Sequence, residues 1–287
     1  MIKPLLQTAT ISALAVGCMF YPFMPGTYDR MAVTISGMAQ MLGVGALLLV
    51  PIGVLWLIYD RANVRRRVGT ARQSEKHHWF GFCALGASLV VGAGIAMAAL
   101  QTGPSLAIAV FIGCVYVVWR AVPAVKRLKT DGNIGFKWAP LFLIVVPSVL
   151  VVARLAFFET AVEISRHRTI GGSAQFINAI ESYRATHGRY PSSLESVHHD
   201  YDPPTVGVER YRYEPYGEAY NVFFEQPTFP IGTQEFVMYN PRDEHVMMVH
   251  NQDLLESAQE QVEGERNFHA LRARDTGVPH WKYFWFD

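Results

Sequence analysis

The sequence predicts a membrane protein of two parts: an all-α membrane region of about five transmembrane helices, followed by an α+β extracytoplasmic domain. Two observations predict this fold class. Residues 1–158 contain the long apolar runs, whereas residues 159–287 are rich in tyrosine and turn residues. The first segment carries 14 Lys and Arg against 4 Asp and Glu, and the second carries 11 against 20. Because the basic charge accompanies the apolar runs, it indicates membrane topology and no nucleic-acid partner.

Five apolar stretches are long enough, at about 18 to 22 residues, to cross about 30 Å of hydrocarbon as helices. They are residues 5–24, 38–59, 79–100, 105–122 and 138–158. We therefore expect a transmembrane region over 1–158, with the lipid bilayer as its first partner. Pro51 and Pro147 lie inside the second and fifth spans and are expected to kink them.

The distribution of Lys and Arg orients these spans. Segments 60–78 and 123–137 are strongly basic, whereas 25–37 and 101–104 hold one basic residue between them. Basic loops stay in the cytoplasm, so an odd number of spans places residues 159–287 on the opposite side. In a Gram-negative cell this predicts a multi-pass inner-membrane protein with a periplasmic domain.

The N-terminal apolar run has a second interpretation. Residues 14–18, which end at Cys18, loosely match a bacterial lipoprotein cleavage site. The run continues to Phe23 as an uncleaved span does, and either interpretation leaves the C-terminal domain outside. Cys18, Cys83 and Cys114 all lie in apolar runs, so we expect no disulfide.

The third span carries small residues at a spacing of four. They are Ala84, Ser88, Gly92 and Ala96. This spacing lines one helix face with a groove that a second helix can approach closely. Packing within the bundle is the simpler interpretation, and a homo-oligomer is the alternative. Arg120 and Arg154, near span ends, are the only ionisable residues we find in the spans, which argues against a transporter.

Beyond the fifth span the sequence predicts helix. Polar residues continue the helical pattern until Gly171-Gly172 weakens or interrupts it, and Ser173 suits the N-cap of a second helix. In that helix Phe176, Ile180 and Tyr183 have the spacing of one face.

After about residue 205 the hydrophobic pattern changes to the period of two that is typical of strands. We expect two hairpins, a polar helix and an aromatic strand, in this order: 209–214 with 219–225, 235–239 with 245–249, 252–263 and 281–286. The expected domain is a helix crossing a small antiparallel sheet.

Residues 179–194 read AIESYRATHGRYPSSL. This segment resembles the end of the long first helix and the following loop of type IV pilins and type II secretion pseudopilins, which commonly run (I/L)xxYxxxxGxYPxxL. The matching residues are Tyr183, Gly188, Tyr190 and Pro191. The resemblance implies a pilin-like fold, in which the two tyrosines pack the long helix on the sheet while the glycine and proline reverse the chain.

Pilins begin with a short basic leader, a Gly cleavage site and a Glu early in the mature helix. Here the corresponding helix is internal, and residues 137–140, KWAP, offer no such site. We therefore expect a pilin-like domain on a polytopic anchor, without cleavage by prepilin peptidase. The resemblance implies no catalytic residue.

Other residues of chemical interest lie in polar surroundings. His198, His199, Asp200 and Asp202 are metal-ligand types in one loop, which we interpret as solvated. His245 and His250 are expected on opposite sides of a strand. The motifs of hydrolases, zinc sites and phosphate loops are not found. We therefore expect no enzyme, no cofactor and no metal.

The aromatic residues of the second part have two interpretations. They are Tyr211, Tyr213, Tyr220, Trp281, Tyr283 and Trp285. They can form a face that binds carbohydrate or peptide, or they can pack one side of the sheet against the helix. The second interpretation suits a domain of this size better.

These observations predict a non-enzymatic membrane protein that presents its outer domain to an envelope protein or another envelope component, linked to a secretion or pilus-type system. The alternative is a membrane-embedded enzyme or small-solute transporter with an accessory domain. A water-filled polar cavity between the spans would favour that alternative.

Overall fold

A computed structural model describes residues 2–67, 77–100, 102–127, 138–193, 197, 201–216, 218–228, 234–245 and 272–286. The chain forms two compact units. The helical unit contains Met1–Phe20 and Thr34–Phe158, and the α+β unit contains Tyr21–Val33 and Glu159–Asp287. The chain passes between units after Phe158, where the predicted membrane region ends. The loop Tyr21–Val33, however, belongs to the second unit.

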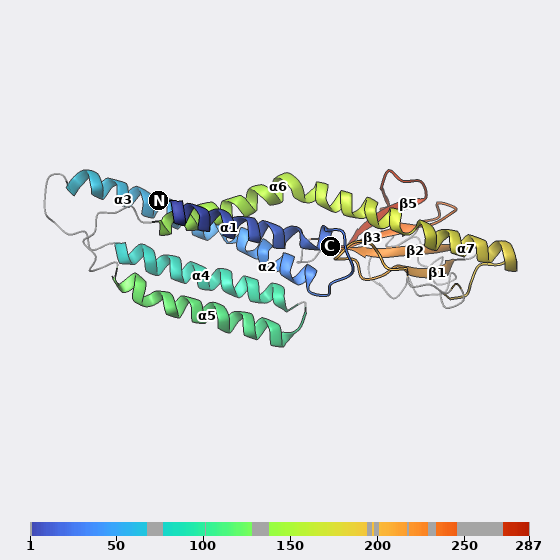
Figure 1. Ribbon diagram of the computed structural model, residues 1–287, viewed down its shortest axis with the longest axis horizontal. Coiled ribbons are helices and arrows are strands. Elements are labelled where there is room, and N and C mark those ends of the chain that lie inside the picture. Colours follow the sequence, from blue (N-terminus) through green and yellow to red (C-terminus); the bar gives the residue numbers. More distant parts are fainter. Residues whose placement is uncertain are drawn as a thin grey trace. The chain divides into compact units, whose positions relative to one another are not determined.

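The helical unit is built from six helices in the described residues (Figure 1). They are α1 Ile2–Phe20, α2 Ala32–Val44, α3 Ala46–Arg67, α4 His77–Ala99, α5 Pro104–Arg127 and the first part of α6 Ala139–Gly172. Four described segments are long and apolar enough to cross a membrane: Lys3–Phe23, Trp79–Ala99, Pro104–Arg127 and Ala139–His187. The bent pair of α2 and α3 makes up to five. The chain therefore has the helices of a membrane protein.

The second predicted span, 38–59, is broken at Gly45, ahead of its proline. Helices α2 and α3 meet at Gly45 with a bend of 41°. A Cβ atom at Gly45 would lie 2.7 Å from the side chain of Val91 on α4. The bend thus lies where α4 approaches the backbone, whereas Pro51 sits inside α3.

Helices α1, α2 and α6 share a buried cluster in the helical unit. It contains Met19, Ala39, Leu150 and Ala153. Near it the Ser36 hydroxyl donates to the Met19 carbonyl. Thr34, at the start of α2, is hydrogen-bonded to Thr102, which lies between α4 and α5. These two connections therefore lie at one end of the unit.

Helix α7, Ala174–His187, continues α6 with one turn residue between them. Ser173 has helical angles, φ −77° and ψ −10°. Its N–H bonds to the Thr169 carbonyl at 3.2 Å, and its own carbonyl accepts from the Ile177 N–H at 2.9 Å. The predicted boundary after Gly171-Gly172 and the N-cap position of Ser173 are therefore confirmed, but the Ser173 side chain makes no cap hydrogen bond. Because the hydrogen-bond ladder runs through Ser173, its hydroxyl bonds back to the Ile170 carbonyl instead.

The two glycines of α6 differ in what surrounds them, which gives a first testable prediction. A Cβ at Gly172 would lie 2.5 Å from Pro204, whereas nothing lies within 4 Å of one at Gly171. Gly172→Ala should therefore lower the thermal unfolding midpoint of the α+β unit. Gly171→Ala should leave it unchanged or raise stability by about 0.5–1 kcal/mol, because Ala favours a helix. Equal midpoints would mean that Pro204 moves freely.

In the described residues, the α+β unit contains an antiparallel sheet of five strands. They are β1 Arg212–Tyr216, β2 Ala219–Gln226, β3 Gln234–Tyr239, β4 Arg274–Asp275 and β5 Trp281–Phe286, in the order β1-β2-β3-β5-β4. The first predicted hairpin is confirmed as β1 and β2, with Tyr213 opposite Val222. The aromatic strand 281–286 is also confirmed, and it lies inside the sheet with β4 on its outer side.

The second predicted hairpin is wrong. Strand β3 pairs with β2 on one side and with β5 on the other, where Val237 lies opposite Tyr283. Both edges of β3 are thus occupied by strands other than the predicted partner. Residues 246–249, and the candidate helix 252–263, lie outside the described residues.

The sheet has a buried cluster on each face. The cluster on the helix side joins α6 and α7 to the sheet and contains Ile170, Phe176, Ile180, Val208, Tyr211, Tyr220, Val222, Phe224, Val237 and Trp281. The cluster on the other side contains Phe223, Phe236, Met238 and Phe284. Alternate residues of β2 and β3 therefore supply opposite faces, as a strand period of two requires.

The loop Tyr21–Val33 is hydrogen-bonded to the segment before β1. Gly26 N–H donates to the Pro204 carbonyl at 3.3 Å, and Val206 N–H donates to the Met24 carbonyl at 3.0 Å. Gly207 N–H donates to the Pro22 carbonyl at 2.8 Å. The α+β unit is thus assembled from two separate stretches of chain, so the predicted domain, residues 159–287, is not the whole of it.

Candidate functional site

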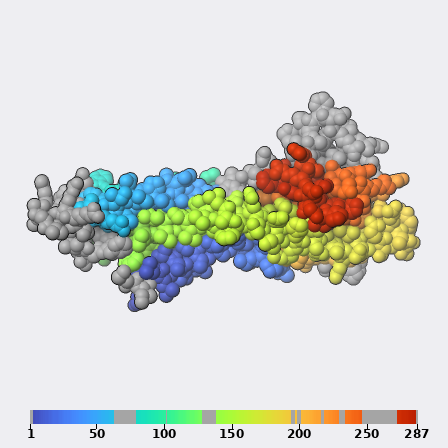
Figure 2. Space-filling model, turned by 90° about the horizontal axis from the view of Figure 1, so that it is seen from above, coloured from blue at the N-terminus to red at the C-terminus, as the bar shows by residue number. Residues whose placement is uncertain are grey.

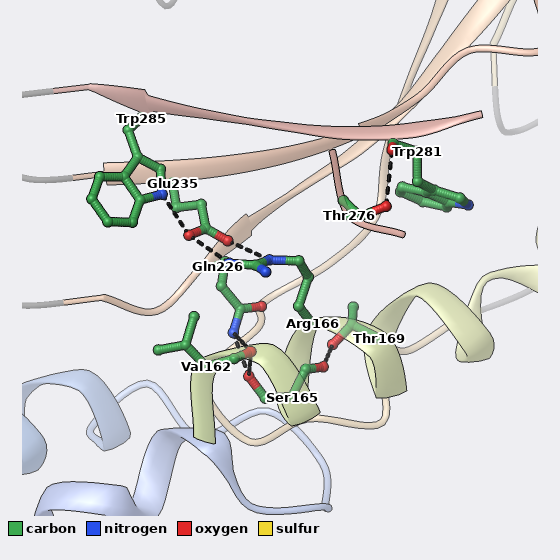
Figure 3. Close-up of polar contacts among 9 residues, drawn as sticks. All are labelled: Val162, Ser165, Arg166, Thr169, Gln226, Glu235, Thr276, Trp281 and Trp285. Carbon is green, nitrogen blue, oxygen red and sulfur yellow. Dashed lines mark hydrogen bonds and ion pairs between the residues drawn. The ribbon is translucent and has the colours of Figure 1, made fainter. Parts of the chain in front are cut away.

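A buried ion pair ties α6 to the sheet (Figure 3). Arg166 Nε donates to Glu235 Oε1 at 2.7 Å, and Arg166 Nη2 donates to Oε2 at 3.0 Å. The Trp285 indole N–H donates to the same carboxylate at 2.8 Å. The Glu235 side chain is fully buried, and the guanidinium lies 4.2 Å from the centre of the Tyr283 ring. Three donors therefore satisfy one buried carboxylate.

A neighbouring polar contact ties β2 to the same helix. The Gln226 side-chain amide donates to the Ser165 hydroxyl, and it lies 3.4 Å from the Val162 carbonyl. One turn later the Thr169 hydroxyl donates to the Ser165 carbonyl at 3.0 Å. We call Val162, Ser165, Arg166, Gln226, Glu235 and Trp285 the clamp (Figure 3).

The main effect of the clamp is to fix the position of α6 on the sheet. Removing two charges from water costs several kcal/mol per ion, so a buried pair is not by itself a source of stability. It does penalise any helix position that separates the charges, because an unpaired buried charge is expensive. The clamp therefore sets the register of α6 on β2, β3 and β5.

A second polar group lies at the other end of the helix, around Glu181. Tyr220 donates its hydroxyl hydrogen to Glu181 Oε1 at 2.8 Å, and the Tyr190 ring packs edge-on against Tyr220, with 4.8 Å between centroids. Arg184 donates to the Tyr190 hydroxyl and lies 4.5 Å from its ring centre. Burial raises the pKa of the Tyr220 phenol, and the Glu181 bond raises it further. The phenol therefore stays protonated as a donor.

Three of the four residues of the pilin-like motif, Gly188, Tyr190 and Pro191, lie close to the Glu181 group and shape the end of α7 and the turn after it. Gly188 has φ +71° and its N–H bonds to the Arg184 carbonyl at 2.8 Å, so it ends α7 in a left-handed conformation. Pro191 is buried, and its carbonyl accepts from the Tyr213 hydroxyl at 2.7 Å. Tyr190 packs against the sheet through Tyr220.

Tyr183 differs from expectation. Its ring stacks on His187, one turn along α7, with 4.0 Å between centroids. The half-buried Tyr183 side chain is not among the residues of the core cluster, which takes Phe176 and Ile180 from this helix. The core face of α7 thus turns away from Tyr183 toward Ile177.

The aromatic residues of the sheet pack against the helix, as the second interpretation predicts. Tyr211, Tyr220 and Trp281 are buried in the cluster, and Tyr213 and Tyr283 pack against it. The packing in this cluster therefore occupies the face of the sheet that would otherwise be available to a ligand. Trp285 is the exception, because its N–H is in the clamp while its ring is 44% exposed.

One of the four small residues of the third predicted span, Gly92, lies against a neighbouring helix. Gly92 lies against Cys114 of α5, where an added Cβ would come within 2.9 Å of the Cys114 Cβ. Ala84 and Ala96 are buried and Ser88 is half-buried. Helices α4 and α5 run side by side (Figure 1). Gly92 therefore packs within the bundle, and a role of the other three residues in such packing stays a prediction.

Among the residues that the structure describes, no group of three or more His, Cys, Asp or Glu side chains could hold a metal ion. His198, His199, Asp200 and His250 lie outside those residues, and Asp202 is exposed. His245 follows β3 outside any strand, and its Nε2 lies 3.0 Å from the His280 carbonyl.

Among the polar contacts that sequence reasoning missed, two left different signals in the sequence. The first is the clamp, although a period of two places Glu235 on the same face as Val237, which was a usable signal. The second is Gln40, buried in α2, whose amide donates to the Ser36 hydroxyl at 3.0 Å. A search for ionisable residues alone overlooks an uncharged amide in a span.

The chain matches none of the protein-family models, curated proteins or solved structures with which it was compared.

Proposed function

We propose that this protein is a non-enzymatic inner-membrane protein that presents a pilin-like periplasmic domain to an envelope protein or another envelope component, as part of a secretion or pilus-type system. One observation carries the proposal. The helix that begins as an apolar span at Ala139 continues to His187 and packs on the sheet. A single helix thus holds the domain and anchors it.

The reach of this helix supports a presenting role. From Phe158 to His187 it extends about 44 Å, at 1.5 Å per residue. Its far end exposes Ser182, Thr186 and Arg189 beside the Glu181 group. The clamp holds the helix in register on the sheet, so this end is presented in one orientation. The Gly188 turn and the Tyr190 contact are the features that the pilin resemblance implies at this point.

The orientation is a separate prediction. Basic segments 60–78 and 123–137 predict a cytoplasmic location, and the loop Tyr21–Val33 is part of the same unit as Glu159–Asp287. Alkaline phosphatase fused after Asp287 should therefore be active, and a fusion near Arg67 inactive. The reverse pattern would invert the topology.

The interaction is tested with a photo-crosslinking residue placed at Ser182, Thr186 or Arg189 of the full-length protein in cells. We expect crosslinks to one envelope partner from these positions. Arg210, exposed on the approach to β1, is the matched control and should give none. Crosslinks of equal strength from Arg210, or none from the three positions, would contradict presentation at this end.

A further inference from the structure

The end of α7 carries basic side chains in a part of the chain that is acidic overall. Residues 182–194 contain Arg184 and Arg189 and no Asp or Glu, whereas residues 159–287 carry 11 Lys and Arg against 20 Asp and Glu. Every residue from Arg184 to Arg189 is exposed. In Figure 1 this end of α7 extends beyond the labelled strands, and in Figure 2 its yellow atoms lie on the surface at one end of the α+β unit. We call residues 184–189 the tip.

The guanidinium of Arg184 is held in place before any partner arrives. It lies 4.5 Å from the centre of the Tyr190 ring and donates to the Tyr190 hydroxyl. The Tyr190 ring is itself fixed against the buried Tyr220. A guanidinium has five N–H donors, so others remain for a carboxylate, which it can bind with two parallel hydrogen bonds. An anchored side chain also loses less conformational freedom on binding.

The acidic side chains described near the tip already have other partners. Glu181 accepts from the Tyr220 hydroxyl at 2.8 Å, and Glu218 accepts from Arg242 at 2.9 Å. The hydrogen bond from Arg242 lowers the pKa of Glu218, and the charge of Arg184 contributes less to this shift. In the described part of the chain, neither arginine of the tip forms an ion pair. Two positive charges are therefore available to a partner.

The position of Arg189 separates this surface from ordinary helix electrostatics. A basic residue in the last turn of a helix is stabilised by the partial negative charge of the helix end, and this accounts for Arg184. Arg189 follows the left-handed Gly188 and lies outside α7, where that effect has fallen off. Its exposed side chain has no hydrogen-bonded neighbour among the described residues. The helix end alone therefore does not explain both arginines.

The contrast between the tip and the rest of the unit limits the kind of anion that fits. An anionic membrane or polysaccharide carries its charge over a wide area and would also meet the acidic surface around the tip. Electrostatic interactions extend over about 8 Å at physiological salt. A compact group of carboxylates on a protein can therefore contact the tip without strong repulsion from the more distant acidic residues.

We propose that the tip docks on an acidic patch of an envelope protein, where Asp or Glu carboxylates pair with Arg184 and Arg189. This inference rests on the proposed function, because it names the chemistry of the partner at the end of the domain that presents itself. Such pairing contributes mainly to the rate and the specificity of association.

The first experiment uses a carbodiimide, which joins an amine to a carboxyl group in direct contact. The reagent activates the carboxyl group, the amine attacks the activated carbon, and an amide bond forms as a urea is released. Arg189→Lys places an amine in the tip of the full-length protein and keeps the charge. In native membranes it should give a protein adduct that neither the unsubstituted chain nor Arg210→Lys gives. Arg210 is the matched control because it is exposed elsewhere on the same unit.

The second experiment reverses the charge. A photo-crosslinking residue at Thr186 reports contact at the tip, and Arg189→Glu is added to it in the full-length protein. The yield of crosslinked product should fall about tenfold, because like charges then face each other, while Arg210→Glu should leave it unchanged. Without either charge reversal, about 1 M salt should also lower the yield, because the Debye length is then about 3 Å.

The outcomes separate this inference from the proposed function. Thr186 crosslinks that persist with Arg189→Glu, without a carbodiimide adduct, would refute the acidic patch and leave presentation intact. If Thr186 gives no crosslink at all, presentation itself fails. An adduct of twice the mass of the chain would assign the acidic surface to a second copy and overturn the envelope partner. A Thr186 adduct whose added mass resists protease would assign the contact to lipid or polysaccharide and also overturn it.

Discussion

Glu235→Ala should lower the free energy of unfolding of the α+β unit by about 3–5 kcal/mol, because it leaves Arg166 buried without its partner. The loss also frees the Trp285 N–H. The measurement is urea unfolding of the full-length protein in detergent micelles, followed by near-UV circular dichroism of the aromatic core. Signal loss should move to a clearly lower urea concentration.

Two variants separate the clamp from general damage. Arg166→Met combined with Glu235→Leu removes both charges, and most of the lost stability should return. Glu218→Ala breaks the exposed pair with Arg242, whose side chains are 86% and 43% exposed, and should change nothing measurable. If the double variant is as unstable as Glu235→Ala, packing of the side chains rather than charge pairing explains the effect.

Phe176→Ala is expected to have an effect of similar size, about 3–5 kcal/mol, because it empties a fully buried aromatic site between α7 and the sheet. Its ring lies 5.9 Å from Tyr211 and 5.1 Å from Tyr201, centroid to centroid. The same urea titration measures it, and Phe176→Leu should recover part of the loss.

Tyr183→Ala is the matched control on the same helix. Since Tyr183 stacks on the exposed His187 and stands apart from the core cluster, its loss should be much smaller. A Tyr183 effect as large as that of Phe176 would mean that α7 is rotated on the sheet, and would restore the pattern that the resemblance to pilins implies.

The variants above test the clamp and the core face of α7, and the sequence predicts these two features to different extents. The apolar spans and the first hairpin were predictable because each depends on local composition, period and turn residues. The same holds for Gly188, whose left-handed conformation ends α7. The helical period also places Phe176 and Ile180 correctly on the core face of α7. The same spacing puts Tyr183 on that face, but the core cluster does not include Tyr183.

The second hairpin shows the limit of local reasoning. Residues 235–239 were correctly expected to be a strand, but the nearest downstream segment was taken as their partner. The actual partner, β5, begins at Trp281, more than 40 residues later. Strand pairing is decided by which apolar faces can be buried together, and adjacency along the chain is only a tendency.

The sequence by itself determined the division into a helical unit with apolar spans and an aromatic α+β unit, because hydrophobicity and charge act residue by residue. Only the tertiary structure decided the continuous helix through Ser173, the pairing of Arg166 with Glu235 and the membership of Tyr21–Val33 in the second unit. The ion pair and the loop join residues that are distant in the chain. The continuous helix overrides the local tendency of Gly171-Gly172 to weaken it. Packing of the helix on the sheet outweighs the helix-weakening tendency of two glycines, and no local pattern contains that energy.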